Sequence, residues 1–267
     1  MNIHNKLLSW MSISHDDDSI LDYLETELIK SQSLNQNADS NRIYLEKRIL
    51  TAHLRYLDVI SFLKENSFYE AWVELERIEI DLMVIKDNKD FIPEISHYGI
   101  NFLARMVRNW QNLFPYKIFG SSRELIKEVR CSVCNQTRSF IDDCGHVKNK
   151  IYNGNLCYDE VVDFEIITYD VVSNPVNKFS VFFASDGDHN NYSHLISVIK
   201  YIESPHQIFQ VLTWKYKTQE HTGVISPESM CPCGNFKKYA NCCLKYDFIC
   251  GKHIHIWFPL PLNVEPV

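Results

Sequence analysis

Near the C-terminus, four of the chain's nine cysteines lie within the thirteen residues 231–243. A segment this short cannot bury enough apolar surface to offset the conformational entropy that it loses on ordering. Thiolates converging on one Zn²⁺ ion would supply the missing stability, since structural zinc sites contribute on the order of 10–16 kcal/mol near neutral pH. Pro232 and Gly234 favour a turn that returns Cys233 to Cys231, and about two helical turns over residues 235–242 would bring the last two cysteines round. We therefore predict a zinc site with the ligands Cys231, Cys233, Cys242 and Cys243.

A second group of metal-ligating residue types lies in the middle of the chain. Cys131 and Cys134 form a CxxC pair, whose two intervening residues let a tight loop direct both thiols at one ion. After nine intervening residues, Cys144 and His146 flank a glycine and would complete the site. Cys157 is an alternative in place of Cys144 or His146, and a set of buried thiols without metal is another. The predicted ligands of this second zinc site are Cys131, Cys134, Cys144 and His146.

The C-terminal cysteine segment resembles the SEC-C zinc knuckle, which is named after the C-terminus of the preprotein-translocase motor SecA. The family pattern is CPCGSGKKxxxCC, and Asn235-Phe236 stands here in place of Ser-Gly. The resemblance covers less than a tenth of the chain. It implies zinc binding by the four cysteines and a basic knuckle that docks on other macromolecules, and it names no reaction. The matching residues are Cys231, Pro232, Cys233, Gly234, Lys237, Lys238, Tyr239, Cys242 and Cys243.

A looser similarity extends over the rest of the chain. The run 69–72 (YEAW), the run 113–116 (LFPY), the CSVC and CGH motifs and the run 151–154 (IYNG) are similar to bacterial SEC-C-containing proteins. This similarity implies one integrated architecture and brings no activity with it.

Composition and charge limit the class of protein. The chain has 267 residues and 45% hydrophobic content, which is enough for one large or two ordinary domains. No export signal opens the sequence and no apolar run approaches membrane-spanning length, so cysteines at metal spacing indicate a reduced, cytoplasmic protein. The net charge of −7 is uneven, with −7 on residues 1–90 and +4 on residues 91–150. The negative charge of the first third therefore does not indicate nucleic-acid binding.

The first 115 residues show helical periodicity. Helices are expected from Ser19 and from Ile43, on either side of a polar loop over 31–41. A third is expected from Ser67, with Ala71, Leu75 and Ile78 on its apolar face opposite Glu74, Glu76 and Asp81. A fourth covers 98–113, and Pro115 ends the pattern. These helices predict an antiparallel bundle.

The rest of the chain has mixed patterns. Residues 123–130 read as a helix, 161–172 as a strand, 178–184 as a strand, 192–201 as a helix and 208–216 as a strand, with a last strand over 254–258. The predicted fold class is α+β with three parts. These are a helical bundle over 1–120, a zinc-ribbon-like α+β domain over 121–225, and a zinc knuckle with a C-terminal strand over 226–267.

Two functions from different classes fit these residues. The favoured one is a non-catalytic zinc-binding adaptor for a protein or ribonucleoprotein partner, because four protein ligands leave no open position on either metal for water or substrate. The alternative is a metal-dependent hydrolase or nuclease. It would use the acidic neighbours of 159–189 or the pair His253 and His255, which share one strand face. The acidic candidates and their neighbour are Asp163, Glu165, Asp170, Asp186, Asp188 and His189.

Basic residues are interleaved with aromatic residues over 105–130, a composition that suits single-stranded RNA. Lys237 and Lys238 add positive charge beside the knuckle. The basic residues of the middle segment are Arg105, Arg108, Lys117, Arg123, Lys127 and Arg130, with Tyr116 and Phe119 among them. RNA contact through these residues is a further expectation, and no membrane partner is expected.

Overall fold

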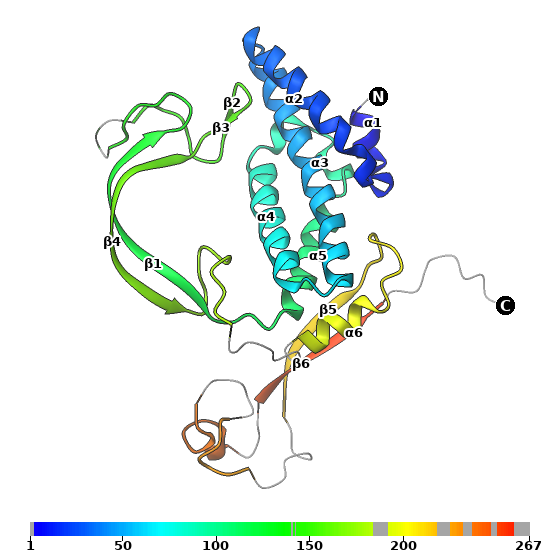
Figure 1. Ribbon diagram of the computed structural model, residues 1–267, viewed down its shortest axis with the longest axis vertical. Coiled ribbons are helices and arrows are strands. Elements are labelled where there is room, and N and C mark those ends of the chain that lie inside the picture. The colour runs from blue at the N-terminus through cyan, green and yellow to red at the C-terminus, as the bar shows by residue number, and fades with distance from the viewer. Residues whose placement is uncertain are drawn as a thin grey trace, which may run out of the picture. The chain divides into compact units, whose positions relative to one another are not determined.

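The computed structural model describes residues 3–139, 141, 143–183, 192–217, 225–231, 237–246 and 250–258 (Figure 1). The chain divides into two compact units, residues 1–207 and 208–267. The first unit contains both the helical bundle and the central cysteine group, which the sequence analysis assigns to separate domains. The helices are α1 (Ile3–Leu8), α2 (Asp18–Ser33), α3 (Asn37–Lys64), α4 (Phe68–Asp87), α5 (Ile100–Leu113) and α6 (Ser193–Ile199). The strands are β1 (Phe119–Cys131), β2 (Ile151–Tyr152), β3 (Asn155–Leu156), β4 (Asp159–Val172), β5 (Gln210–Lys217) and β6 (Cys250–Trp257).

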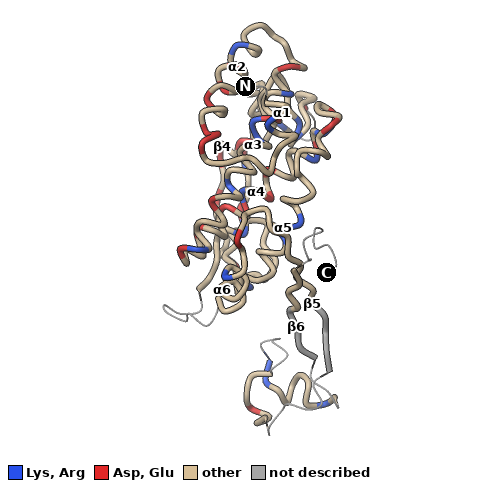
Figure 2. The backbone as a smooth tube through the Cα atoms, turned by 90° about the vertical axis from the view of Figure 1, so that its right-hand side faces the viewer, with Lys and Arg blue, Asp and Glu red and all other residues tan. Residues whose placement is uncertain are grey.

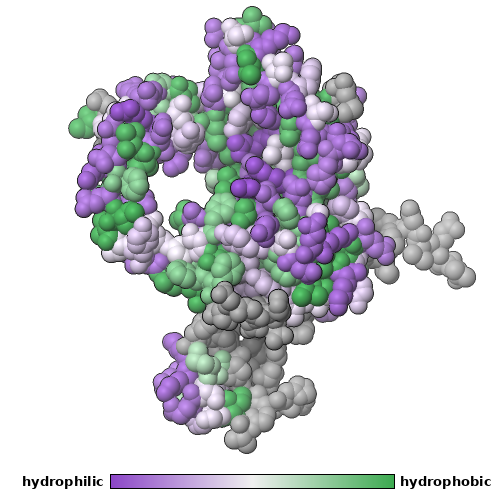
Figure 3. Space-filling model, in the orientation of Figure 1, coloured by the Kyte–Doolittle hydropathy of each residue, from purple (hydrophilic) through white to green (hydrophobic). Residues whose placement is uncertain are grey.

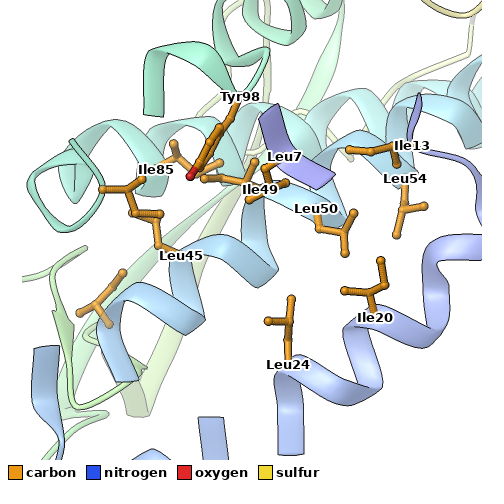
Figure 4. Packing of buried hydrophobic residues seen from close by; sticks show 12 residues of the cluster. Leu7, Ile13, Ile20, Leu24, Leu45, Ile49, Leu50, Leu54, Ile85 and Tyr98 are labelled. Carbon is orange, nitrogen blue, oxygen red and sulfur yellow. The ribbon is translucent and has the colours of Figure 1, made fainter. Parts of the chain in front are cut away.

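The helical bundle confirms the N-terminal periodicity. Helices α2 to α5 pack around apolar side chains that are almost completely buried, contributed also by α1 (Figure 4). Acidic and basic residues are interspersed along the backbone of these helices (Figure 2). No helix in the described part of the chain is long and apolar enough to cross a membrane. The labelled core residues are Leu7, Ile13, Ile20, Leu24, Leu45, Ile49, Leu50, Leu54, Ile85 and Tyr98.

The prediction of a polar loop over residues 31–41 is wrong. Helix α2 continues to Ser33 and α3 already begins at Asn37. The left-handed backbone of Asn35 (φ 53°) makes the short reversal possible, because asparagine tolerates this conformation. Within the helices, the Ser31 and Ser40 hydroxyl oxygens lie 2.5 Å apart in a buried hydrogen bond. Their polarity is satisfied inside the protein, so it does not mark a loop.

Two acidic residues expected on the solvent side of α4 are buried. Asp81 accepts hydrogen bonds from Arg48, at 2.6 Å, and from Arg55. Glu76 accepts a hydrogen bond from Gln111 at 2.7 Å and lies 3.7 Å from the Lys178 ammonium group, while burial raises the pKa of Glu76 to about 7. Cationic and amide partners from other elements replace the water that these carboxylates would otherwise need.

Strands β1 and β4 form a long antiparallel ribbon, which corrects the helix predicted over 123–130. The sequence of that segment contains good helix formers, but β4 supplies a complete ladder of backbone partners, and such tertiary pairing overrides propensity. Register shifts occur between Arg123 and Glu124, between Ile126 and Glu128, and between Glu128 and Val129. Bulges of this kind bend strands, and Figure 1 shows the ribbon bowed away from α4.

Both ends of the ribbon are attached to the bundle. At the far end, the Gly154 amide donates to Asn41 Oδ1 at 2.8 Å, and the Ile151 amide donates to Asn88 Oδ1 at 3.1 Å. At the near end, Trp72 Nε1 donates to the Lys178 carbonyl at 2.8 Å. The strand predicted over 178–184 is wrong for the described residues 178–183, where Val181 makes only an isolated bridge.

The second unit contains the strand predicted over 208–216, seen as β5. The last strand predicted over 254–258 is present as β6, and it pairs antiparallel with β5 from Gln210 opposite Trp257 to Lys217 opposite Cys250. These two strands form a sheet of their own, separate from the ribbon. The helix predicted over 192–201 is present as α6, which belongs to the first unit.

Candidate metal centres

The CxxC pair lies where β1 ends. The Asn135 amide donates to the Cys131 carbonyl at 2.8 Å, and the Cys131 amide donates to the Gln136 carbonyl at 2.9 Å. Asn135 itself has a left-handed backbone, with φ 60°. The chain therefore reverses within the turn that carries Cys134, as the two-residue spacing predicts.

The second pair comes from a glycine turn. Gly145 has φ +78°, in the region that glycine adopts without steric cost, and a Cβ there would meet nothing within 4 Å. The ring of His146 packs edge-on against Tyr152 at a centroid distance of 4.6 Å, which fixes its position. The Nδ1 atom of His146 is buried and has no hydrogen-bond partner among the described residues. An imidazole nitrogen left in this state is suited to ligate a metal.

The four predicted ligands converge and form what we call the central cluster. The ligand atoms of Cys131, Cys134, Cys144 and His146 all lie within 4.8 Å of one another. Two thiolates on a tetrahedral zinc ion would be about 3.8 Å apart, given zinc–sulfur bonds of about 2.3 Å. The three cysteines are free thiols, so the cluster could hold a metal ion.

Cys157 lies beside the central cluster but is not in the set of mutually close ligand atoms. Its sulfur is 3.9 Å from that of Cys131, and Arg138 donates to the Cys157 sulfur at 3.0 Å and to the Cys131 sulfur at 3.4 Å. Arg138 also donates to the His146 carbonyl at 2.7 Å. The geometry thus favours His146 over Cys157 as the fourth ligand, with Cys157 as a neighbouring thiol.

Arg138 is a residue that the sequence analysis missed. Burial opposes ionisation of Cys131, but hydrogen bonds from Arg138 and from the backbone amides of Cys134 and Val133 lower the pKa of its thiol to about 5. A thiol that ionises readily is a better metal ligand, because the thiolate is the binding form. The only sequence feature that could have indicated this role is the position of an arginine between the CxxC and CGH motifs.

The C-terminal cluster is made by Cys231, Cys242 and Cys243, whose sulfurs lie within 4.8 Å of one another. The sulfurs of the last two are 3.9 Å apart, against about 2.05 Å in a disulfide. This group too could hold a metal ion. The fourth predicted ligand, Cys233, lies outside the described residues.

Short backbone links hold this cluster together. The Cys231 amide donates to the Lys237 carbonyl at 2.8 Å, and the Tyr239 amide donates to the Ser229 carbonyl at 2.8 Å. Within the region 235–242, where about two helical turns were expected, the described residues form one short 3₁₀ turn, Tyr239–Asn241. A second 3₁₀ turn, Cys243–Lys245, follows that region. Cys231 and Cys243 are buried, with Tyr239 packed against them.

The acidic residues of the alternative hydrolase site do not converge in the described part of the chain. Glu165 pairs with Lys127 at 3.2 Å and Asp170 pairs with Arg123 at 3.3 Å, across the ribbon. Asp163 joins no group of three metal-ligating side chains there. Asp186, Asp188, His189 and the side chain of His253 lie outside the described residues, while His255 is exposed on β6.

The residues expected to contact RNA are dispersed. Arg105 and Arg108 are exposed on α5, whereas Arg123, Lys127 and Arg130 form ion pairs on the ribbon. Tyr116 and Phe119 pack on Trp72 in an aromatic group instead of facing solvent. Lys238 pairs with Glu228 at 2.6 Å. RNA contact through these residues and Lys237 stays a prediction.

Comparison of the chain with protein-family models, with curated proteins and with solved structures finds no match.

Proposed function

We propose that this protein binds two zinc ions as structural centres and acts as a non-catalytic adaptor that presents a surface to a protein partner. The observation that carries the proposal is the central cluster, where three thiols and one imidazole lie within 4.8 Å of one another. Three sulfur ligands and one nitrogen ligand complete a tetrahedron, and a complete tetrahedron leaves no position for water or substrate.

The chemistry of the ligands favours zinc over other common ions. Thiolate and imidazole donors select soft or borderline metals, whereas magnesium and calcium take oxygen ligands. The resemblance of residues 231–243 to the SEC-C knuckle supports a second zinc ion, held by Cys233 together with the three cysteines of the C-terminal cluster. Thiolate ligands persist under reducing conditions, so we place the protein in the cytoplasm.

Metal analysis of variants tests the ligand assignment. Purified wild-type protein should contain two zinc ions per chain by mass spectrometry. Cys134→Ser and Cys233→Ser should each remove one ion, because each deletes one of four ligands. Cys157→Ser is the matched control and should keep both, since its sulfur belongs to neither ligand set. Protein without zinc, or a Cys134→Ser variant that keeps both ions, would show that the assignment is wrong.

X-ray absorption at the zinc edge tests the structural role. A filled shell of three or four sulfurs at about 2.3 Å, completed by one nitrogen at the central cluster, is expected. An oxygen ligand from water on either ion would indicate an open coordination position and would favour the hydrolase alternative.

A further inference from the structure

The two-stranded ribbon of β1 and β4 lacks the support that such a ribbon needs. An isolated pair of strands is marginally stable in water, and a third strand or a packed helix is usually required. Here both ends contact the bundle, but Figure 3 shows an opening between the middle of the ribbon and the helices. The ribbon is a single pair of strands in the described part of the chain.

The pairing register separates the ribbon into two chemically different faces. One face of β1 carries every second residue, namely Gly120, Ser122, Glu124 and Ile126. Residues directly opposite one another on the two strands share a face. Their partners form what we call the apolar face, and the exposed fraction of these side chains runs from 44% at Ile166 to 75% at Tyr169. The four partners on β4 are Phe164, Ile166, Tyr169 and Val171.

The opposite side of β4 is acidic. Asp163, Glu165 and Asp170 lie on it, and β4 as a whole carries five acidic and no basic residues. Cations from β1 balance Glu165 and Asp170, and Arg138 and Lys148 balance Asp159. The exposed Glu160 and Asp163 have no ion pair among the described residues. A negatively charged strand repels nucleic acid and attracts a basic polypeptide.

The two outer edges of the ribbon differ in backbone pairing. The edge of β1 is partly covered, because the Gly120 amide donates to the Ser180 carbonyl at 2.7 Å and the Phe182 amide donates to the Ile118 carbonyl at 2.9 Å. The described residues place no strand against the outer edge of β4. Its backbone groups along 163–166 and 168–172 are in the extended conformation that an added strand can use.

We propose that the outer edge of β4 binds an extended segment of a partner protein in which apolar and basic residues alternate. Such a segment would add a third strand to the ribbon through backbone hydrogen bonds. Its apolar side chains would extend the apolar face beside Phe164 and Ile166, and its basic side chains would meet Asp163 and its acidic neighbours. The inference rests on the proposed adaptor function and identifies the surface and the class of partner.

A defined peptide tests this inference on the full-length, zinc-loaded protein. The probe is a fluorescent ten-residue peptide of alternating valine and lysine, and binding is followed by fluorescence anisotropy. A peptide with glutamate in place of lysine, and one with N-methylated amides along one edge, serve as controls. Binding of each control should be at least tenfold weaker. Equal binding of the lysine and glutamate peptides, or no saturable binding of the lysine peptide, would overturn the proposal.

Variants locate the binding edge. The double variant Glu160→Lys, Asp163→Lys reverses two exposed charges on β4 and should weaken binding of the lysine peptide at least tenfold. The matched control Asp22→Lys, Asp90→Lys makes the same change in net charge on exposed bundle positions and should bind as the wild type does. Tyr169→Ser should also weaken binding, while leaving the helical content unchanged because this side chain is the most exposed of the apolar face. Unaltered affinity in the β4 variants would refute the assignment to this edge.

Two further measurements separate the other outcomes. If sedimentation shows a dimer that Tyr169→Ser dissociates, a second copy of the chain occupies the ribbon and the proposal is wrong. Zinc is measured in every sample. Loss of peptide binding with both ions present refutes only the ribbon inference, whereas protein that lacks zinc refutes the proposed function.

Discussion

Replacing Gly154 by alanine should detach the far end of the ribbon from the bundle. Gly154 has φ +72°, and a Cβ there would lie 2.5 Å from Leu28 Cδ1 and 3.1 Å from Gln32 Nε2. The left-handed backbone costs a residue with a Cβ about 1–2 kcal/mol, and overpacking of a well-packed site adds about 1–3 kcal/mol. We expect the free energy of unfolding to fall by about 2–5 kcal/mol in urea titrations of the metal-loaded protein.

A double-mutant cycle with Leu28→Ala separates the two contributions. Leu28 is 5% exposed, so its truncation alone should cost about 2–5 kcal/mol. In the double variant the clashing methyl group is gone, and the two changes together should cost about 1–3 kcal/mol less than their sum. If the two costs add within about 0.5 kcal/mol, the close approach of Gly154 to Leu28 does not govern this junction.

The buried carboxylates of α4 provide two more tests. Asp81→Asn leaves Arg48 and Arg55 facing a neutral amide and should lower the free energy of unfolding by about 3–5 kcal/mol. Asp58→Asn, which removes an exposed pair, should cost no more than about 1 kcal/mol, and similar losses in both variants would contradict this reasoning. The folded state binds the Glu76 proton more tightly than the unfolded state does, since burial raises its pKa from 4.5 to about 7. The contribution of this group to stability is therefore complete below pH 4.5 and is lost as the pH rises through 7. Thermal melts should show wild-type stability falling relative to Glu76→Gln between pH 5 and 8, and parallel pH profiles would refute this assignment.

Local spacing was enough to predict which described cysteine and histidine side chains lie close enough together to hold a metal ion. Two cysteines in a CxxC turn, or a cysteine and a histidine on either side of a glycine, are brought close by a few backbone angles. Short segments of sequence therefore determine the convergence of Cys131 with Cys134 and of Cys242 with Cys243. The amphipathic repeats of α3 and α4 are local in the same sense, because a 3.6-residue period defines a buried face without knowledge of the partner.

The strand conformation of the ribbon and the burial of the charged residues could not be predicted from local sequence patterns. Residues 123–130 consist largely of good helix formers, and their strand conformation depends on a partner that begins at Asp159. Likewise, Asp81 is buried because Arg48 and Arg55 reach it from another helix. Arg138 acts on Cys131 and Cys157 through contacts that no motif records.

The sequence by itself determined the helical first half of this protein and the residues able to bind metal, since both follow from interactions between near neighbours along the chain. Only the tertiary structure decided that Cys157 lies beside the central cluster, that two carboxylates of α4 are buried, and that β4 exposes one acidic and one apolar face. These features depend on pairing between distant segments, where the free energy comes from contacts that a local pattern does not contain.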